Sequence, residues 1–313
     1  MGGSSEREQW MQKTVVVWLG AMLCCALWGS AFPFVKIGYQ LFDIVSEDTA
    51  SQILFAGCRF TLAGIMAIII GSMAARQILR PSRDNMGRVL WLSLLQTVLQ
   101  YLFFYIGLAH TSGVKASIIE AVNVFVAILV ASILFHQEKL TFQKIAGCLV
   151  GFAGVVLINL DGMNFDMSLQ GEGFIFLSTV AYAFSSVFLK RFSVKDNTVM
   201  LSGYQFVVGG MIMVAVGIVM GGSVGFPSGK ALLLLLYLAM VSAVAYSVWG
   251  LLLKYNPVSR VAVFGFMNPV FGVILSAIFL HEDDQASGLV SILSLVLVCI
   301  GIYVVNSGKL HEK

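Results

Sequence analysis

Charged residues are scarce in this sequence. They make up 11% of its 313 residues, whereas soluble domains carry roughly a quarter. Apolar residues account for 58%. A folded chain of about 300 residues still leaves roughly a quarter of its unfolded surface in water, and so few charges cannot keep that surface polar. The composition therefore excludes an ordinary soluble protein and favours a protein embedded in a bilayer.

Several other classes are excluded by what is missing. The net charge is only +3 and the basic residues are scattered, so no surface for nucleic acid is expected. The sequence has no P-loop or His-Glu-x-x-His motif, so neither ATP-driven transport by this chain alone nor enzymatic chemistry is expected. No Cys-x-x-Cys pair or paired histidines indicate a metal site, a haem or another cofactor. The five cysteines lie inside apolar runs, at positions Cys24, Cys25, Cys58, Cys148 and Cys299.

What the sequence does have is a series of long apolar runs. About 20 apolar residues in a helix cross the roughly 30 Å of hydrocarbon in a bilayer. Backbone groups in lipid must be paired within their own segment, so each run is predicted to be helical. The prediction is an all-α integral membrane protein with ten transmembrane helices, over residues 15–35, 50–73, 89–109, 114–135, 143–160, 171–189, 199–220, 231–253, 258–280 and 287–306.

The basic residues indicate the orientation of these spans. If the N-terminus is inside, only Lys36, Lys115 and Lys230 fall in outer segments and Arg59 falls within a span. The other fifteen of the nineteen lysines and arginines then lie inside. Cytoplasmic segments of membrane proteins carry such an excess. Both termini are therefore predicted to be cytoplasmic.

The chain also repeats itself. Glycines recur every seven residues in the second span (Gly57, Gly64, Gly71) and again 146 positions later (Gly203, Gly210, Gly217); the same offset pairs Arg59-Phe60 with Gln205-Phe206. We interpret these glycines as helix-packing residues. The predicted halves are residues 1–160 and 161–313, with five spans each. Because five is odd, the second half is inverted relative to the first, which is a recurring plan of secondary transporters.

Short motifs in order along the chain resemble a known family. They are Leu27-Trp28-Gly29-Ser30, Arg59-Phe60, Asn268-Pro269, Leu280-His281-Glu282 and the tail Gly301-Ile302-Tyr303-Val304-Val305. Over nearly its whole length the sequence is similar to the drug/metabolite transporter superfamily, in its EamA-type branch. This resemblance implies a ten-helix, inverted-repeat carrier in the plasma membrane, which is the inner membrane in bacteria. Such carriers often export amino acids or related metabolites.

One position departs from the family pattern. Phe125 stands in the fourth span where the ninth span has Pro269. Because proline interrupts the hydrogen bonds of a helix, the fourth span is expected to be straighter than the ninth.

The base Arg59 and the acid Glu120 are the ionisable residues placed well inside predicted spans. Arg59 lies about 14 Å and Glu120 about 9 Å from the outer ends of their helices. A charge at such depth needs a partner or a wet cavity. Three interpretations stay open. The two residues form a structural ion pair, or they bind the carboxylate and ammonium groups of a zwitterionic substrate, or Glu120 carries a proton coupled to transport.

Further polar and aromatic residues recur at corresponding places in the two halves. We interpret them with Arg59 and Glu120 as the lining of a substrate cavity, since such groups are disfavoured against lipid. The alternative is that they only join helices through hydrogen bonds. The remaining candidates are Trp28, Gln100, Tyr101, Tyr105, Asn123, Tyr182, Tyr246, Trp249 and Asn268.

Four charged residues at span ends receive structural roles. Glu138 and Glu282 are expected to be solvated and to cap or orient helices, and Lys36 and Lys190 are expected to reach towards lipid headgroups.

The predicted function is secondary transport of a small organic solute such as an amino acid, most simply outwards, by alternating access. The expected partners are this solute and the lipid bilayer, with proton coupling as an added option, and the protein is a monomer or a homodimer. The alternatives are a multi-pass membrane receptor or scaffold and a membrane-embedded enzyme.

Overall fold

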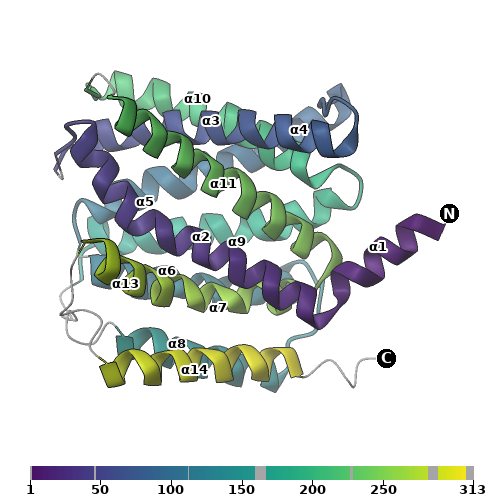
Figure 1. Cartoon of the computed structure of the whole chain (residues 1–313). Helices are drawn as coiled ribbons and strands as arrows, with labels where there is room; N and C mark the ends of the chain where they lie inside the picture. The colour runs from purple at the N-terminus through teal and green to yellow at the C-terminus, as the bar shows by residue number, and fades with distance from the viewer. Residues whose placement is uncertain are drawn as a thin grey trace.

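The computed structural model is built from helices packed side by side (Figure 1). It describes residues 2–45, 47–111, 113–158, 167–225, 228–280 and 288–307, and within these ranges it contains no β-strand. The helices of the first half are α1 (Gly2–Gln12), α2 (Thr14–Leu41), α3 (Thr49–Ala75), α4 (Arg83–Leu92), α5 (Gln100–Leu108), α6 (Gly113–Ala121), α7 (Asn123–Leu129) and α8 (Phe142–Ile158). Those of the second half are α9 (Phe174–Ser193), α10 (Thr198–Val219), α11 (Gly229–Tyr255), α12 (Val258–Ala262), α13 (Met267–Leu280) and α14 (Gly288–Ser307).

Short irregular helical segments connect some of these helices. The π-helical segment η1 (Ser93–Leu99) joins α4 to α5, η2 (Val130–Leu134) follows α7, and η4 (Leu169–Gly173) precedes α9. A 3₁₀ segment, η5 (Val263–Phe266), lies between α12 and α13. π-Helical segments are rare in proteins, and those that do occur often lie at functional sites.

The protein is a multi-pass membrane protein. Among the described residues, seven helical segments are long and apolar enough to cross a bilayer: Thr14–Leu41, Thr49–Ala75, Arg83–Leu108, Leu169–Ser193, Thr198–Val219, Gly229–Tyr255 and Val258–Ser276. Three shorter apolar helices are Ile118–Leu134, Phe142–Ile158 and Ile292–Ser307. The prediction of an all-helical membrane protein is therefore confirmed. Helix α1 and the end of α14 lie at the same end of the bundle (Figure 1).

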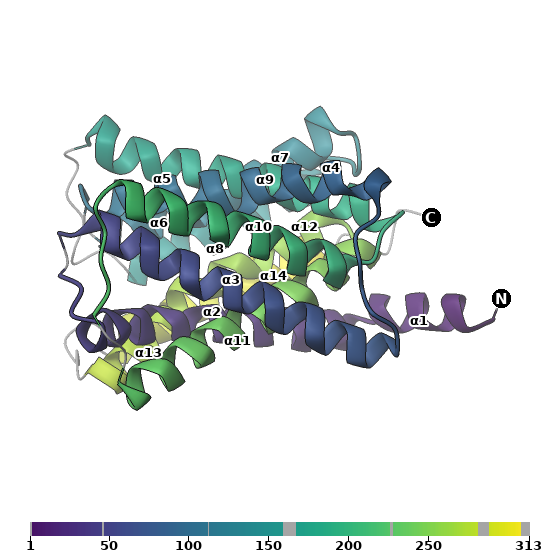
Figure 2. The same ribbon diagram turned by 90° about the horizontal axis from the view of Figure 1, so that it is seen from above.

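Helices α3 and α10 pack against each other through the repeated glycines. A Cβ atom on Gly64 would lie 2.5 Å from the Gly203 carbonyl oxygen and 2.6 Å from the Val207 nitrogen. One on Gly57 would lie 2.5 Å from the Val214 nitrogen. Earlier residues of α3 therefore meet later residues of α10, so the two helices are antiparallel. They lie side by side in both views (Figures 1 and 2). The interpretation of these glycines as packing residues is confirmed, because only glycine lets the backbones come so close.

The other helices pack in matching pairs. Helix α8 lies against α14, where a Cβ on Gly147 would lie 2.8 Å from the Gly301 carbonyl oxygen and one on Gly154 would lie 2.8 Å from the Ser294 carbonyl oxygen. Helix α2 packs against α11 and α13, and α9 packs against α5 and α7. The predicted border between the halves, at residues 160 and 161, lies outside the described residues.

The fourth predicted span is locally irregular, as the ninth is, and the expectation that it is straighter than the ninth stays a prediction. Helix α6 ends at Ala121 and α7 begins at Asn123. Between them Val122 donates its backbone N–H to Ile119, three residues back. Val122 keeps helical backbone angles (φ −62°, ψ −21°) and its carbonyl accepts from the Val126 N–H at 3.1 Å, so one tightened turn joins α6 to α7 without a proline. The ninth span changes to the 3₁₀ segment η5 just before Pro269, so both spans are irregular.

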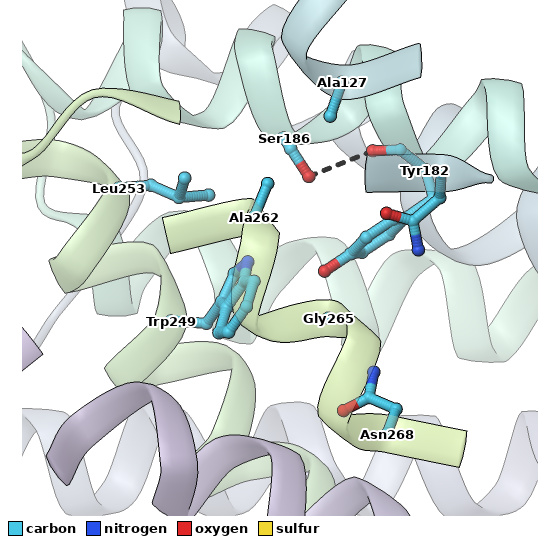
Figure 3. Close-up of a pocket in the computed structure, with 9 residues that line it drawn as sticks. Ala127, Tyr182, Ser186, Trp249, Leu253, Ala262, Gly265 and Asn268 are labelled. Atoms are coloured by element: carbon cyan, nitrogen blue, oxygen red, sulfur yellow. Dashed lines mark hydrogen bonds between the residues drawn. The ribbon is translucent and has the colours of Figure 1, made fainter. Parts of the chain in front are cut away.

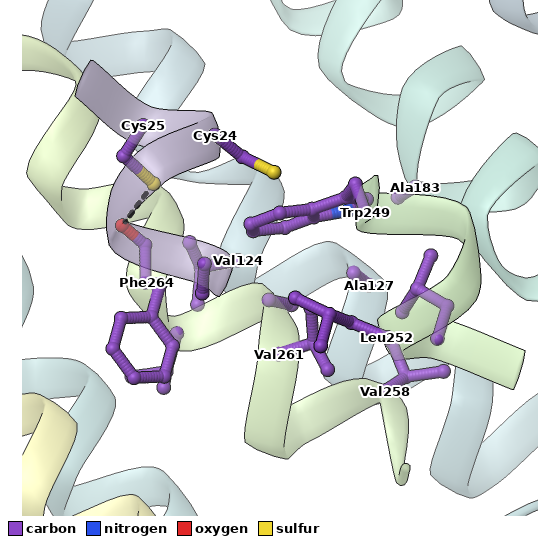
Figure 4. Close-up of a cluster of buried hydrophobic side chains, with 14 of the residues drawn as sticks. Cys24, Cys25, Val124, Ala127, Ala183, Trp249, Leu252, Val258, Val261 and Phe264 are labelled. Carbon is purple, nitrogen blue, oxygen red and sulfur yellow. Dashed lines mark hydrogen bonds between the residues drawn. The ribbon is translucent and has the colours of Figure 1, made fainter. Parts of the chain in front are cut away.

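The core lies where α2, α7, α9, α11 and α12 meet (Figure 4). Its side chains include Val124, Trp249 and Leu252, all at most 3% exposed. Two cysteine thiols of α2 donate hydrogen bonds to backbone carbonyls of α11 and η5. Cys24 donates to the Ala245 carbonyl at 3.3 Å and Cys25 donates to the Phe264 carbonyl at 3.2 Å.

Asp48 caps the N-terminus of α3. Its carboxylate accepts hydrogen bonds from the Ser51 backbone N–H at 3.0 Å and the Ser51 hydroxyl at 2.5 Å. Both bonds favour the charged carboxylate, so they lower the pKa of Asp48 below its usual range. The Ser51 hydroxyl also accepts from the Ser223 backbone N–H at 2.8 Å, which links this cap to the segment after α10.

Replacing Asp48 by alanine is expected to lower the free energy of unfolding by about 1 kcal/mol at pH 7, the usual effect of losing an N-cap. The lowered pKa means that this stabilisation is present above the ordinary aspartate pKa of about 4. It is lost as the pH falls through the lower pKa of the folded state. Thermal unfolding of wild type and Asp48→Ala at pH 7 and pH 3 measures the effect. Asp48→Asn is the control, because it keeps a cap but cannot titrate, and an Asp48→Ala deficit of equal size at both pH values would contradict the prediction.

Candidate functional site

A small cavity lies at the meeting point of α7, α9, α11 and the α12–α13 region (Figure 3). It offers about 10 Å³ to the centres of water-sized molecules, which is room for about one water. In this conformation it is therefore too small for an organic solute. Its lining residues are Asn123, Ala127, Tyr182, Ser186, Trp249, Leu253, Ala262, Gly265 and Asn268.

Irregular backbone brings polar groups to this cavity. Asn123 is the first residue of α7, directly after the tightened turn at Val122. On the facing side Gly265 belongs to the 3₁₀ segment η5, and Asn268 follows it in α13. The Oδ1 atom of Asn268 is buried and has no hydrogen-bond partner. Two locally irregular spans thus deliver two side-chain amides to one place.

Four residues predicted from the sequence line this cavity: Asn123, Tyr182, Trp249 and Asn268. Sequence reasoning missed Ser186, whose hydroxyl donates to the Tyr182 carbonyl at 3.0 Å. Its position four residues after Tyr182 was the available signal, because residues i and i+4 share one face of a helix.

A cluster of aromatic rings adjoins the cavity and contains further predicted residues. The ring of Trp28 meets those of Tyr246 and Trp249 edge-on, with centroids 5.1 Å and 5.0 Å apart. The hydroxyls of Tyr101 and Tyr246 are hydrogen-bonded at 2.8 Å. Tyr105 is buried in the same cluster. Trp28 and Trp249 therefore connect the cluster to the cavity.

The centre of the cluster is a pair of phenylalanines from the two halves. The rings of Phe60 and Phe206 are stacked, with centroids 5.3 Å apart and an interplanar angle of 9°. Tyr101 lies against Phe60 at 4.3 Å, and Tyr246 meets Phe206 edge-on at 4.8 Å. Sequence reasoning paired the two phenylalanines across the halves but did not place them in the site.

Arg59 lies beside this cluster and is 5% exposed. Its Nη2 donates to the Ser242 hydroxyl at 2.9 Å, and its buried Nε has no hydrogen-bond partner. Its guanidinium acts electrostatically on the hydroxyls of four tyrosines, Tyr39, Tyr101, Tyr105 and Tyr246. Ser242 and Tyr39 were not predicted, and no spacing in the sequence singles them out.

The structure does not join Arg59 to Glu120. Within the described ranges, no carboxylate oxygen lies within the 4.0 Å ion-pair distance of the Arg59 guanidinium. Glu120 is half-buried near the end of α6 and acts electrostatically on Tyr105. Tyr105 therefore interacts electrostatically with both Arg59 and Glu120. The structural ion pair between Arg59 and Glu120, one of the three interpretations, is not formed in this structure.

Gln100 is the remaining predicted residue. It is buried in the first turn of α5, directly after the π-helical segment η1. It interacts with the Tyr246 hydroxyl, and its Oε1 has no hydrogen-bond partner. The structure thus places ten of the eleven candidates in or beside the cavity and the aromatic cluster, and the eleventh, Glu120, within electrostatic reach of Tyr105.

Glu138 and Lys190, two charged residues at span ends, differ from expectation. Glu138 does cap a helix, since it accepts from the Ser259 N–H of α12 at 2.9 Å and from the Ser259 hydroxyl at 2.5 Å. It is nevertheless buried and not solvated. Lys190 donates to the Asn256 carbonyl at the end of α11. It does not reach for headgroups, because the last carbonyls of a helix attract a cation. Glu282 lies outside the described residues.

Comparison with known proteins gives a consistent result. The family model described as the EamA-like transporter family matches residues 16–160 and, a second time, residues 169–307. A Bacillus subtilis protein named "Uncharacterized transporter YvbV" is 24% identical, over 92% of this chain and 90% of its own. An Escherichia coli protein named "Probable amino-acid metabolite efflux pump" is 26% identical, over 91% and 92% of the two chains. A crystal structure with 17% identity shares the fold, with a TM-score of 0.75 over 96% of this chain and 100% of that chain.

Proposed function

This chain belongs to the EamA-like transporter family, and we propose that it is a secondary transporter that moves a small organic solute across the membrane by alternating access. The observation that carries the proposal is the pair of locally irregular helices around one cavity. In secondary transporters, discontinuous helices form the substrate site at the interface of two repeats. Here Asn123 follows a tightened turn and Asn268 follows a 3₁₀ segment, and both face the same cavity. Family membership also confirms the resemblance seen in the sequence.

The architecture that we propose is ten transmembrane helices in two inverted repeats, residues 1–160 and 161–313. The three shorter apolar helices would complete the seven longer ones. Support comes from the matching helix pairs, since α2 packs against α11 and α13 as α9 packs against α5 and α7. The two separate matches of the family model agree with a duplication. Two similar, inverted halves can form outward-open and inward-open states of comparable energy.

The membrane location, the orientation of the termini and the direction of transport are inferred from the distribution of basic residues and from the relatives. We propose a plasma membrane location, the inner membrane in a bacterium, with both termini cytoplasmic because basic residues concentrate on that side. Outward transport of an amino acid or a related metabolite is supported by the Escherichia coli relative, which is named "Probable amino-acid metabolite efflux pump". Proton coupling through Glu120 belongs to the same proposal, and the protein would act as a monomer or a homodimer.

Reconstitution tests the proposal. Purified protein is first screened for thermal stabilisation by amino acids, nucleosides and amines, and each stabilising solute is then tested for counterflow in proteoliposomes with and without a pH gradient. Counterflow of at least one solute above protein-free vesicles is expected. Binding without flux would favour a receptor, and a chemically altered solute would favour an enzyme.

Replacing Asn268 by leucine is expected to lower the initial rate of counterflow about tenfold. The change removes an amide at the cavity, so a polar group of the bound solute would lose its hydrogen-bond partner. Leaving a buried polar group unsatisfied costs about 1–3 kcal/mol, and about 1.4 kcal/mol corresponds to a factor of ten. Cys299→Ala is the control, because Cys299 is exposed on α14 away from the cavity. Equal rates in Asn268→Leu and the control would remove Asn268 from the site.

A further inference from the structure

Arg59 and Gln205 hold corresponding positions in the two halves. They are 146 positions apart, as are the phenylalanines that follow them. The following rings, Phe60 and Phe206, are stacked on each other between α3 and α10. Arg59 and Gln205 therefore flank one stack from equivalent places, one with a charge and one without.

The two residues make equivalent packing contacts. Arg59 reaches from α3 to α11, where it donates to the Ser242 hydroxyl at 2.9 Å. Gln205 reaches from α10 to η1, where its Oε1 accepts from the Thr97 hydroxyl at 2.6 Å. A neutral amide thus makes this type of helix-to-helix contact in the second half. The positive charge of Arg59 is not required for the packing.

The charge of Arg59 is also not balanced by the protein. Arg59 is 5% exposed, its Nε is unpartnered, and no acid of the described chain lies within ion-pair distance. A charge at this depth of a membrane helix is unfavourable by a few kcal/mol unless it is paired or hydrated. A buried guanidinium with a free N–H beside the aromatic cluster is therefore prepared for an external anion.

The surroundings indicate the chemical class of that anion. One guanidinium balances one negative charge, and its planar donors fit the two oxygens of a carboxylate. The hydroxyls of Tyr39, Tyr101, Tyr105 and Tyr246 are close enough to sense this charge. The remaining walls are aromatic rings of the cluster described above, which suit an apolar body.

We propose that Arg59 binds the carboxylate group of a small organic monocarboxylate, whose apolar part lies against the aromatic cluster. This inference rests on the proposed transport function and names the substrate class for the same site. It does not require Glu120. Arg59 is not among the residues that line the cavity, and the aromatic cluster beside it is packed, so the carboxylate would enter in a more open state.

The test compares each acid with its own amide. Binding to purified protein is titrated with benzoate and benzamide, phenylacetate and phenylacetamide, and L-phenylalanine and L-phenylalaninamide. At least one acid is expected to bind saturably and at least tenfold more tightly than its amide, the ratio expected for a hydrogen-bonded charge pair. No acid binding, or equal affinity for every acid and its amide, would overturn the proposal.

Arg59→Gln tests the residue itself, since it installs the amide that the second half uses at this position. Its preference for the acid is expected to fall to within about twofold, and an unchanged preference would overturn the proposal. Gln205→Ala is the matched control, because it removes the equivalent packing contact without altering charge, and it should keep the preference. If Arg59→Gln cannot be purified as a monodisperse protein, Arg59→Lys decides. It keeps the charge but loses the planar fork, so acid binding should weaken severalfold while amide binding stays unchanged, and wild-type acid affinity would contradict the proposal.

Counterflow of the same compounds separates this inference from the proposed function. Flux of solutes by wild type without preference for acids would overturn the role of Arg59 and leave transport standing. Arg59-dependent acid binding without flux of any compound would overturn transport and leave the carboxylate site standing.

Discussion

Replacing Gly64 by alanine is expected to destabilise the protein by about 1–3 kcal/mol, the usual cost of overpacking, and replacing it by leucine is expected to prevent recovery of monodisperse protein. The added Cβ would lie 2.5 Å from the Gly203 carbonyl oxygen and 2.6 Å from the Val207 nitrogen. Both neighbours are backbone atoms, so no side chain can rotate away. The whole of α3 would have to move from α10. The measurement is the thermal unfolding midpoint in detergent, with size-exclusion chromatography as the test for folding.

Gly87→Ala is the matched control for this experiment. Gly87 also lies within a helix, α4, but a Cβ there would have no atom within 4 Å. Alanine is the better helix former by up to about 1 kcal/mol, so this change should leave the midpoint unchanged or raise it. The same substitution is therefore expected to have opposite effects at the two positions. Equal midpoints for Gly64→Ala and Gly87→Ala would show that α3 and α10 do not depend on this close approach.

Replacing Glu138 by alanine is expected to lower the free energy of unfolding by about 3 kcal/mol, the range for breaking a buried charged pair. Glu138 accepts two hydrogen bonds from Ser259 and forms an ion pair with Lys144 at 3.2 Å. Its removal leaves the Lys144 ammonium short of its countercharge and the first turn of α12 without a cap. The thermal midpoint should fall by about 5 °C or more.

Two further variants separate the charge from the cap. Glu138→Gln keeps a side-chain oxygen for Ser259 and loses only the charge opposite Lys144, so its deficit should lie between those of wild type and Glu138→Ala. Glu8→Ala removes an exposed carboxylate on α1 and should change the midpoint by less than 1 °C or so, as surface changes usually do. A Glu138→Ala protein as stable as Glu8→Ala would mean that this buried cluster does not stabilise the fold.

The helices themselves are close to what hydropathy predicts. The predicted run 258–280 coincides with α12 to α13, and the run 50–73 differs from α3 (Thr49–Ala75) by one or two residues at each end. The predicted run 15–35 ends six residues before α2, which ends at Leu41. Hydropathy follows the apolar core of the bilayer, whereas a helix ends where its backbone finds other partners.

The tightened turn at Val122 could not be predicted from the sequence. The expectation of a straight span rested on Phe125, because the absence of proline removes the best-known cause of a kink. Here the helix tightens one turn without a proline. The segment packs opposite the irregular segment η5, where Val124 would contact a Cβ on Gly265 at 3.2 Å. Tertiary packing therefore decides the local backbone at this point.

The candidate site was predictable in its residue types and not in its contacts. Trp28, Tyr182 and Trp249 could be identified because they are polar-edged aromatics at corresponding positions in the two halves. Lys190 shows the limit of such reasoning, since its position at a span end suggested headgroups while its ammonium binds the Asn256 carbonyl. Side-chain direction depends on the rotation of each helix, and the composition of a span does not specify that rotation.

The sequence by itself determined that this protein lies in a membrane, that its glycines recur in two halves, and that Arg59 is a charge within a span. These properties depend on the transfer free energy of each segment and on its periodicity, which are local. Only the tertiary structure decided that α3 and α10 meet backbone to backbone, that two locally irregular helices share a cavity, and that Arg59 contacts Ser242 and not Glu120. Those outcomes depend on how closely helices approach and which faces they turn to each other, and these are properties of the packed chain as a whole.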